Sequence, residues 1–167
     1  MHIVYLHTGS NLGDRLANLE MANALIEKYI GEIEKYSRIY LTEAWGIENQ
    51  PDFYNQAVLV KSALSPHQIL EQISGIEKEM GRVRIIKWGE RLIDIDILFY
   101  DDEVITMEDL NIPHPELQNR NFVLCPLEDI APALVHPILG KTITQLRKES
   151  PDPLQAKPLH HKQQEEE

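Results

Sequence analysis

Two aspartates, Asp94 and Asp96, lie two residues apart in an otherwise apolar run. The run is rich in β-branched and aromatic residues, so it predicts a strand over residues 93–100. Side chains alternate along a strand, so both carboxylates should share one face, with their α-carbons roughly 6.5–7 Å apart. Paired carboxylates on an apolar strand favour a hard divalent cation such as Mg²⁺, and the alternative is a strand face covered by water. The opposite face is expected to carry Ile93, Ile95, Ile97 and Phe99.

A basic segment runs directly into this strand. It contains Arg82, Arg84 and Arg91, together with Trp88. Arginine binds phosphate oxygens through paired hydrogen bonds, and a Trp ring offers a flat face to a heteroaromatic base. A metal held by carboxylates next to such cations is suited to polyphosphate transfer, because both neutralise charge on the phosphates. The alternative is a solvated run of charges.

The composition limits the classes of function. The chain has 167 residues, a formal net charge of −11 and one cysteine. This length favours one domain, and the acidic charge argues against general binding of nucleic acids or anionic membranes. A single cysteine cannot form an intrachain disulfide. The chain starts without signal-peptide features and has no apolar run long enough to span a membrane, so we expect a reducing, cytoplasmic setting.

The apolar spacing predicts the elements that position these groups. The order β-α-β-β-α-β indicates an α+β fold with a ferredoxin-like core, in which both helices cover one face of an antiparallel sheet. An extra hairpin and short helices should follow. We expect 1–149 to form a single catalytic domain and 150–167 to be a mobile tail. The predicted core strands are 2–8, 33–41, 53–63 and 93–100; the core helices are 14–31 and 65–81; a short strand falls at 104–105; and the later helices are 116–120, 122–130 and 142–149.

Aromatic and amide side chains provide further candidates. Phe53 and Asn55 fall on one strand face, where a ring and an amide suit a flat polar heterocycle. They could equally be a core Phe and a turn-capping Asn. Phe122 is either a second stacking ring or part of the core. His114 and Arg120 could grip one phosphate, although a lone histidine is more often structural.

Two other features are ambiguous. Residues 9–15, Gly-Ser-Asn-Leu-Gly-Asp-Arg, lack the spacing and the lysine of a phosphate-binding loop. We therefore interpret them as a strand-to-helix turn. Glu77 is expected on a helix face, where pairing with Arg82 is favoured over metal binding.

Together the motifs resemble the 6-hydroxymethyl-7,8-dihydropterin pyrophosphokinase family of folate biosynthesis. The resemblance covers roughly residues 3–146 in matching order. It implies a ferredoxin-like core and transfer of the β,γ-pyrophosphoryl group of ATP to the pterin hydroxymethyl oxygen, which yields the pterin diphosphate and AMP. The matching stretches are 9–15, 50–55, Glu77 with 81–84, 88–97, 113–115, Arg120 with 122–124, and 126–132.

The resemblance also implies roles for individual residues. Asp94 and Asp96 would hold two Mg²⁺ ions, and Arg82 and Arg91 would stabilise the moving charge. The general base is left open between Asp94 and a transition state that needs none. ATP and the pterin are the expected partners of a monomer. The ATP site would comprise Glu77, Arg84, Trp88, Ile97, His114, Pro115 and Arg120, and the pterin pocket Thr42, Glu43, Trp45, Phe53, Asn55 and Phe122.

The chain departs from the family pattern in places. Glu90 stands where Pro is usual, and Leu92 where Thr is usual; Ser74 and Asp109 replace Gln and Arg near ATP in some relatives. One rival class is a metal-dependent phosphohydrolase or nucleotidyl transferase, which gives no reason for the aromatic set. A second rival is a ferredoxin-like binding module without catalysis, which predicts a basic sheet face rather than an Asp pair.

Overall fold

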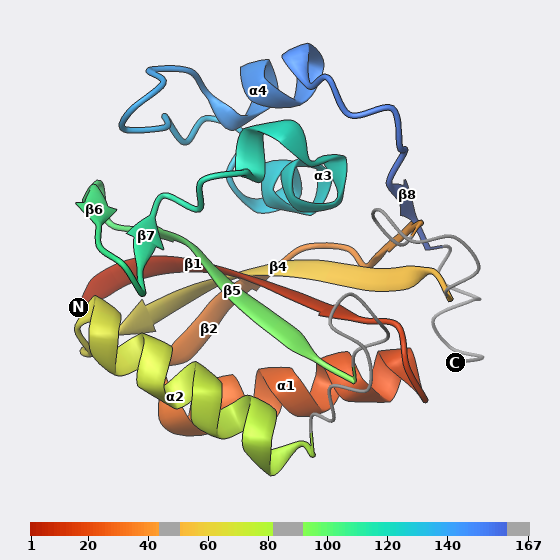
Figure 1. Cartoon of the computed structure of the whole chain (residues 1–167), viewed down its shortest axis with the longest axis vertical. Coiled ribbons are helices and arrows are strands. Elements are labelled where there is room, and N and C mark those ends of the chain that lie inside the picture. The colour runs from red at the N-terminus through yellow and green to blue at the C-terminus, as the bar shows by residue number, and fades with distance from the viewer. Residues whose placement is uncertain (44–50, 82–91, 160–167) are drawn as a thin grey trace.

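The computed structural model describes residues 1–43, 51–81 and 92–159. A six-stranded antiparallel sheet lies between two layers of helices (Figure 1). Its strand order is β5-β1-β4-β3-β8, and β2 also pairs with β4. The first half of the chain forms β1 (His2–Ser10), α1 (Arg15–Tyr29), β2 (Glu32–Tyr36), β3 (Tyr40–Thr42), β4 (Phe53–Ser62), α2 (Pro66–Glu79) and β5 (Asp94–Tyr100). The second half forms β6 (Ile105–Thr106), β7 (Asn111–Ile112), the 3-10 helix η1 (Leu117–Asn119), α3 (Asn121–Ile130), α4 (Ile143–Glu149) and β8 (Lys157–Pro158).

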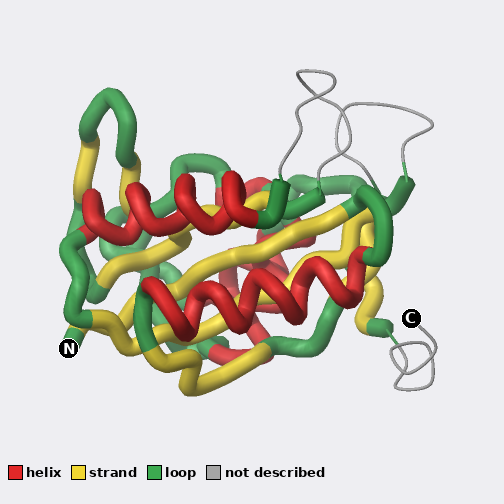
Figure 2. The backbone as a smooth tube through the Cα atoms, turned by 90° about the horizontal axis from the view of Figure 1, so that it is seen from below, coloured by secondary structure: helices red, strands yellow, loops and turns green. Residues whose placement is uncertain are grey.

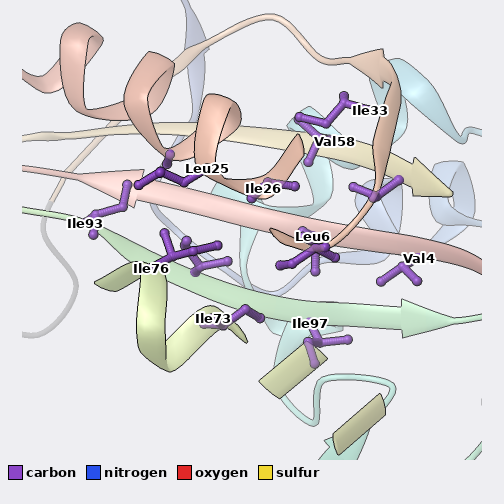
Figure 3. Close-up of a cluster of buried hydrophobic side chains, with 14 of the residues drawn as sticks. Val4, Leu6, Leu25, Ile26, Ile33, Val58, Ile73, Ile76, Ile93 and Ile97 are labelled. Carbon is purple, nitrogen blue, oxygen red and sulfur yellow. The ribbon is translucent and has the colours of Figure 1, made fainter. Parts of the chain in front are cut away.

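Each face of the sheet buries its own apolar cluster. Helices α1 and α2 run side by side across one face (Figure 2). They enclose a cluster that includes Leu6, Ile26, Ile76 and Ile97 (Figure 3). Helices α3 and α4 lie over the opposite face (Figure 1), where Phe99 belongs to a second cluster. The predicted pair of helices on one face is therefore present, and a second helical layer covers the other face.

The two long helices begin where the sequence predicts. The Asp14 side chain accepts a hydrogen bond from the backbone N–H of Ala17, and so caps α1. Ser65 and Gln68 form a reciprocal capping box at the start of α2. Both arrangements satisfy backbone donors that the first helical turn leaves free.

The predicted strand 33–41 is divided into β2 and β3. Pairing with β4 shifts by one residue between Tyr36, opposite Val58, and Tyr40, opposite Asn55. At the break, the backbone N–H of Ala57 donates to the Ser37 hydroxyl at 2.9 Å. A side chain thus takes the place of a strand carbonyl, which ends regular pairing.

A second irregularity corrects the expected side of Phe99. The pairing between β1 and β5 shifts between Tyr5 and Leu6, so Leu6 lies opposite Ile97 whereas Tyr5 lies opposite Phe99. The extra residue, Leu98, changes the alternation of faces. Phe99 therefore packs beneath α3, away from Ile97.

The chain after α4 makes defined contacts with the body of the protein. Strand β8 pairs with β3, and Leu159 is buried. The domain boundary at 149 and the mobility of 150–167 stay predictions. In the described ranges, no helix combines the length and apolar character needed to cross a membrane.

Gly31 provides a test of the packing between α1 and the sheet. A Cβ at Gly31 would overlap the backbone carbonyl of Lys61, which belongs to β4. We expect Gly31→Ala to lower the free energy of unfolding by about 2–4 kcal/mol, because backbone must move to relieve the overlap. Gly75 in α2 is a matched control with open space around it. Gly75→Ala should raise stability by about 0.5–1 kcal/mol. Urea denaturation measures both, and equal effects would contradict this account.

Candidate active site

A row of residues across three strands forms the floor of the candidate site. Gly9 in β1 lies opposite Asn55 in β4 on one side and Asp94 in β5 on the other. Neighbouring strands are spaced by 4.7–4.9 Å, so Asn55 and Asp94 flank the glycine with α-carbons roughly 10 Å apart. Pairing of Asp96 with His7 places the second carboxylate one step along the same face. The predicted carboxylates and the predicted heterocycle-binding amide thus share one surface.

Gly9 leaves no room for a side chain. A Cβ built on it would lie 2.9 Å from the Asn55 Oδ1 and 3.5 Å from the Phe53 ring. These contacts confirm that Phe53 and Asn55 lie on the same face. The glycine lets both of these β4 side chains lie over the neighbouring strand β1.

Asn55 is held in one orientation from β3. Its Nδ2 donates a 2.6 Å hydrogen bond to the Thr42 hydroxyl, and both residues are buried. The amide oxygen then points toward Gly9. A fixed amide can select the hydrogen-bonding edge of a flat polar ligand.

The two carboxylates are half-buried on β5. Between them, the backbone N–H of Ile95 donates to the Glu77 carboxylate at 3.1 Å. Glu77 therefore anchors the strand between the aspartates from α2. Among the described residues, no three or more His, Cys, Asp or Glu side chains are grouped so that they could hold a metal ion. A pair of carboxylates such as Asp94 and Asp96 fits Mg²⁺, because this ion takes one or two protein carboxylates and completes its shell with phosphates and water.

His7 lies on this face beneath the start of α3. It is buried, and its Nε2–H donates to the Phe122 carbonyl at 3.0 Å. The two rings also meet edge to face, with centroids 5.7 Å apart. Burial, with a smaller effect of His114 and Arg120, lowers the pKa of His7 to about 4, although the hydrogen bond to Phe122 opposes this shift. His7 is thus a neutral support for Phe122.

The loop before α3 carries His114 and Arg120. The backbone N–H of His114 donates to the Leu98 carbonyl at 3.1 Å, which fixes the loop to β5. Burial and the charge of Arg120 lower the pKa of His114, whereas Glu116 and Asp94 raise it. His114 is therefore close enough to Arg120 and to Asp94 for both charges to affect it.

The turn after β1 supports the site without entering it. Asn11 donates to the carbonyl of Pro51 at 3.2 Å, and Arg15 donates to that of Asp52 at 2.9 Å. Arg15 also lies 4.0 Å above the Tyr54 ring. These contacts fasten the start of β4, next to Phe53. The predicted strand-to-helix turn is confirmed, and its Asn11 and Arg15 side chains hold the backbone that leads into Phe53.

Not every predicted site residue lies on the face that carries the aspartates. Ile97 lies in the cluster beneath α1 and α2, on the face away from the aspartates. Pro115 and Glu43 are exposed near the site. Sequence reasoning missed His7 and the role of Gly9, because only the register of β1 reveals that they lie between the two functional strands. Outside the described residues lie Trp45, Arg82, Arg84, Trp88, Arg91 and the departure Glu90.

The chain is a small α/β protein. Its candidate site brings together carboxylates and a buried amide, which are side chains of the types that metal-dependent phosphate transfer uses. The family model for 7,8-dihydro-6-hydroxymethylpterin-pyrophosphokinase matches residues 5–132. The 2-amino-4-hydroxy-6-hydroxymethyldihydropteridine pyrophosphokinase of Aquifex aeolicus is 45% identical over 150 residues, which cover 90% of this chain and 93% of the relative. The enzyme of the same name from Synechocystis is 42% identical, over 87% of this chain and 74% of the relative. The chain therefore belongs to the 7,8-dihydro-6-hydroxymethylpterin-pyrophosphokinase family.

A solved structure shows the same fold. The crystal structure of wild-type Plasmodium falciparum HPPK-DHPS with pteroate superposes with a TM-score of 0.75 at 22% sequence identity. The match covers 89% of this chain and 42% of the longer Plasmodium chain.

The buried state of His7 predicts a pH-dependent stability. Its folded pKa of about 4 is below the ordinary value of 6.5, so the unfolded chain takes up the proton first as the pH falls. The free energy of unfolding should therefore fall by about 2 kcal/mol between pH 7.5 and pH 5 on account of His7. His7→Gln should remove this part of the decrease, because a Gln amide can donate to Phe122 without titrating.

The control for this measurement is His67→Gln, since His67 is a half-exposed histidine on α2. Urea denaturation at both pH values would be compared for the three proteins. An unchanged pH dependence in His7→Gln would contradict a buried neutral His7.

Proposed function

We propose that the chain transfers pyrophosphate from ATP to the hydroxymethyl group of 6-hydroxymethyl-7,8-dihydropterin, as its family does, yielding the pterin diphosphate and AMP for folate biosynthesis. One observation carries this assignment to the site. The register of β1 places the carboxylates of β5 and the Asn55 amide of β4 on either side of Gly9. A phosphate-binding group and a heterocycle-binding group thus lie on the same surface, close enough to bind two substrates that react with each other.

We assign Asp94 and Asp96 as the ligands of two Mg²⁺ ions that enter with ATP. Their half-buried position on one strand face supports this, and Glu77 stiffens the strand between them. When bound, Mg²⁺ neutralises phosphate oxygens and orients the β-phosphorus toward the acceptor hydroxyl. His114 and Arg120 supply further contacts to ATP on the same side. Roles for Arg82, Arg84, Trp88 and Arg91 in ATP binding and charge stabilisation are proposed from their match to the family alone.

The pterin would lie between Phe53 and Phe122, with the amide of Asn55 on its polar edge. Three observations support this pocket. Phe53 and Asn55 close over Gly9, Thr42 fixes the amide, and His7 supports Phe122. A rigid pocket of this kind holds the hydroxymethyl group in line with the phosphate, and positioning is the main contribution that such a site makes to the rate.

The strand order β5-β1-β4 followed by β2 and β3, with α1 and α2 on one face, supports a ferredoxin-like description of the core. We propose that this core and the following helices act as one catalytic domain. We also propose a monomer that works in the cytoplasm.

The decisive assay follows AMP. Purified protein is mixed with ATP, Mg²⁺ and 6-hydroxymethyl-7,8-dihydropterin, and AMP is separated from ADP. AMP should form only when the pterin is present. Asp96→Asn should lower kcat by about a hundredfold or more, because the metal loses a charged ligand.

Asp102→Asn is the matched control for this variant, because Asp102 is an exposed aspartate in the turn beyond the other end of β5. Its rate should equal that of the wild type. Formation of ADP regardless of pterin would exclude the proposal and favour a metal-dependent phosphohydrolase.

Gly9→Ala tests the floor of the pterin pocket. The added methyl group would displace the Asn55 amide, which lies within 2.9 Å of the Cβ position. We expect the KM for pterin to rise about tenfold, because a displaced amide loses a buried hydrogen bond to the ligand. The KM for ATP should stay within twofold. An unchanged pterin KM, in a variant that folds normally, would show that Asn55 and Gly9 do not bind the ring.

A further inference from the structure

The segment that follows α4 crosses the molecule as a strap, which we define as residues 150–159. Figure 1 shows it descending in blue from α4 to β8 at the edge of the sheet. One end is fastened to the first residue of α3. The backbone N–H of Asn121 donates to the Asp152 carboxylate at 2.9 Å, and the Asn121 amide donates to the carbonyls of Asp152 at 3.2 Å and Leu154 at 2.7 Å.

The Asp152 carboxylate performs two tasks in this contact. Its Oδ2 accepts from the start of α3, where a negative charge is favoured by the helix dipole. Its Oδ1 accepts from the backbone N–H of Leu154 at 2.9 Å, which folds the strap into a turn. Asp152 therefore fixes the strap to the residue that immediately precedes Phe122.

The other end of the strap is fastened to β3. Lys157 and Pro158 pair with Leu41 and Tyr40, and the backbone N–H of Leu159 donates to the Ile39 carbonyl at 2.9 Å. The last residue of β3 is Thr42, which orients the Asn55 amide. The strap thus joins the two elements that carry Phe122 and Thr42.

Between its two attachments the strap borders a narrow hollow of about 150 Å³ that is partly open to solvent. Thr42 and Phe122, two residues assigned to the pterin pocket, line the body side of this hollow. Its full lining is Thr42, Glu43, Phe122, Asp152, Leu154 and Gln155. The last three belong to the strap, so half of the lining comes from a part of the chain outside the family match at 5–132.

We propose that the strap is the outer wall of the pterin pocket, with Leu154 as the residue that closes it beside Phe122 and Asp152 as a positioning residue for Phe122. This inference rests on the proposed function. Leu154 offers the apolar group that a ring stacked on Phe122 needs at its exposed side. The tie from Asp152 to Asn121 limits movement of the helix start that carries Phe122.

The sheet order makes the effect of the strap selective. Strands β5 and β8 lie at opposite edges of the path β5-β1-β4-β3-β8. The carboxylates assigned to Mg²⁺ and ATP are on β5, whereas the strap ends on β8. A change in the strap should therefore alter binding of the pterin more than binding of ATP.

Two variants test whether the strap is a wall of the pterin pocket. Leu154→Ala shortens a half-buried side chain on the hollow, and Asn121→Ala removes the two amide bonds to the strap. Each should raise the KM for 6-hydroxymethyl-7,8-dihydropterin about five- to tenfold, with kcat and the KM for ATP within twofold of the wild type. Lys157→Ala is the control, since its side chain is exposed on the strap and lies outside the hollow. It should leave all three constants unchanged.

The outcomes separate the proposal from the function on which it rests. Absence of pterin-dependent AMP in the wild type would reject the function. If the wild type is active, an unchanged pterin KM in a Leu154→Ala variant with the same urea denaturation midpoint would show that the strap is not a wall of the pterin pocket. An equal rise in both KM values would also overturn it, because it would indicate a general effect on the fold. A fluorescence titration of the pterin, in the presence of a non-hydrolysable ATP analogue, should show the same weakening of binding as KM.

Discussion

The pairing of β1 with a strand on each side is the interaction on which the remaining structure depends. Nine residues of β1 pair with β4, and six of them also pair with β5. The strand alternates between two buried faces, so a slip of one residue would exchange them. His7 and Gly9 would then enter the core beneath α1 and α2, and Leu6 and Thr8 would face the site. The register that buries the apolar side chains is therefore the register that assembles the site.

The two helical layers have different tasks around this sheet. Helices α1 and α2 bury the larger apolar cluster and fix the strands from one side. They also reach toward the site through Glu77, which holds the backbone of β5 between its aspartates. The layer of α3 and α4 carries Phe122 over the opposite face and is tied to β3 by the network of Arg38, Tyr40 and Asp129. Burial, and then the hydrogen bond and charge of Asp129, raise the pKa of Tyr40, so its hydroxyl stays a donor to that carboxylate.

The sequence is most informative where a local pattern decides the outcome. Caps at Asp14 and Ser65, the alternating aspartates of β5 and the apolar stripes of the long helices are all local, and the structure contains them as expected. The break at Ser37 and the bulge at Leu98 depend on pairing with a distant strand, and so the divided strand and the side of Phe99 escaped prediction. The same holds for the site. Asp94, Phe53 and Asn55 could be selected by type and spacing, but His7 became visible only through its partners across the sheet.

The contact between Asp152 and the start of α3 joins residues that are 31 positions apart in the chain. Arg120, at the N-cap position of α3, is not one of the short polar residues that cap helices well, and a later aspartate serves the first turn instead. During synthesis from the N-terminus, every strand that carries the carboxylates and the Asn55 amide is therefore complete before the residue that secures α3 exists. The order of assembly follows from this. The parts of the site on β4 and β5 can form while the chain is still growing, and the Phe122 side is secured last.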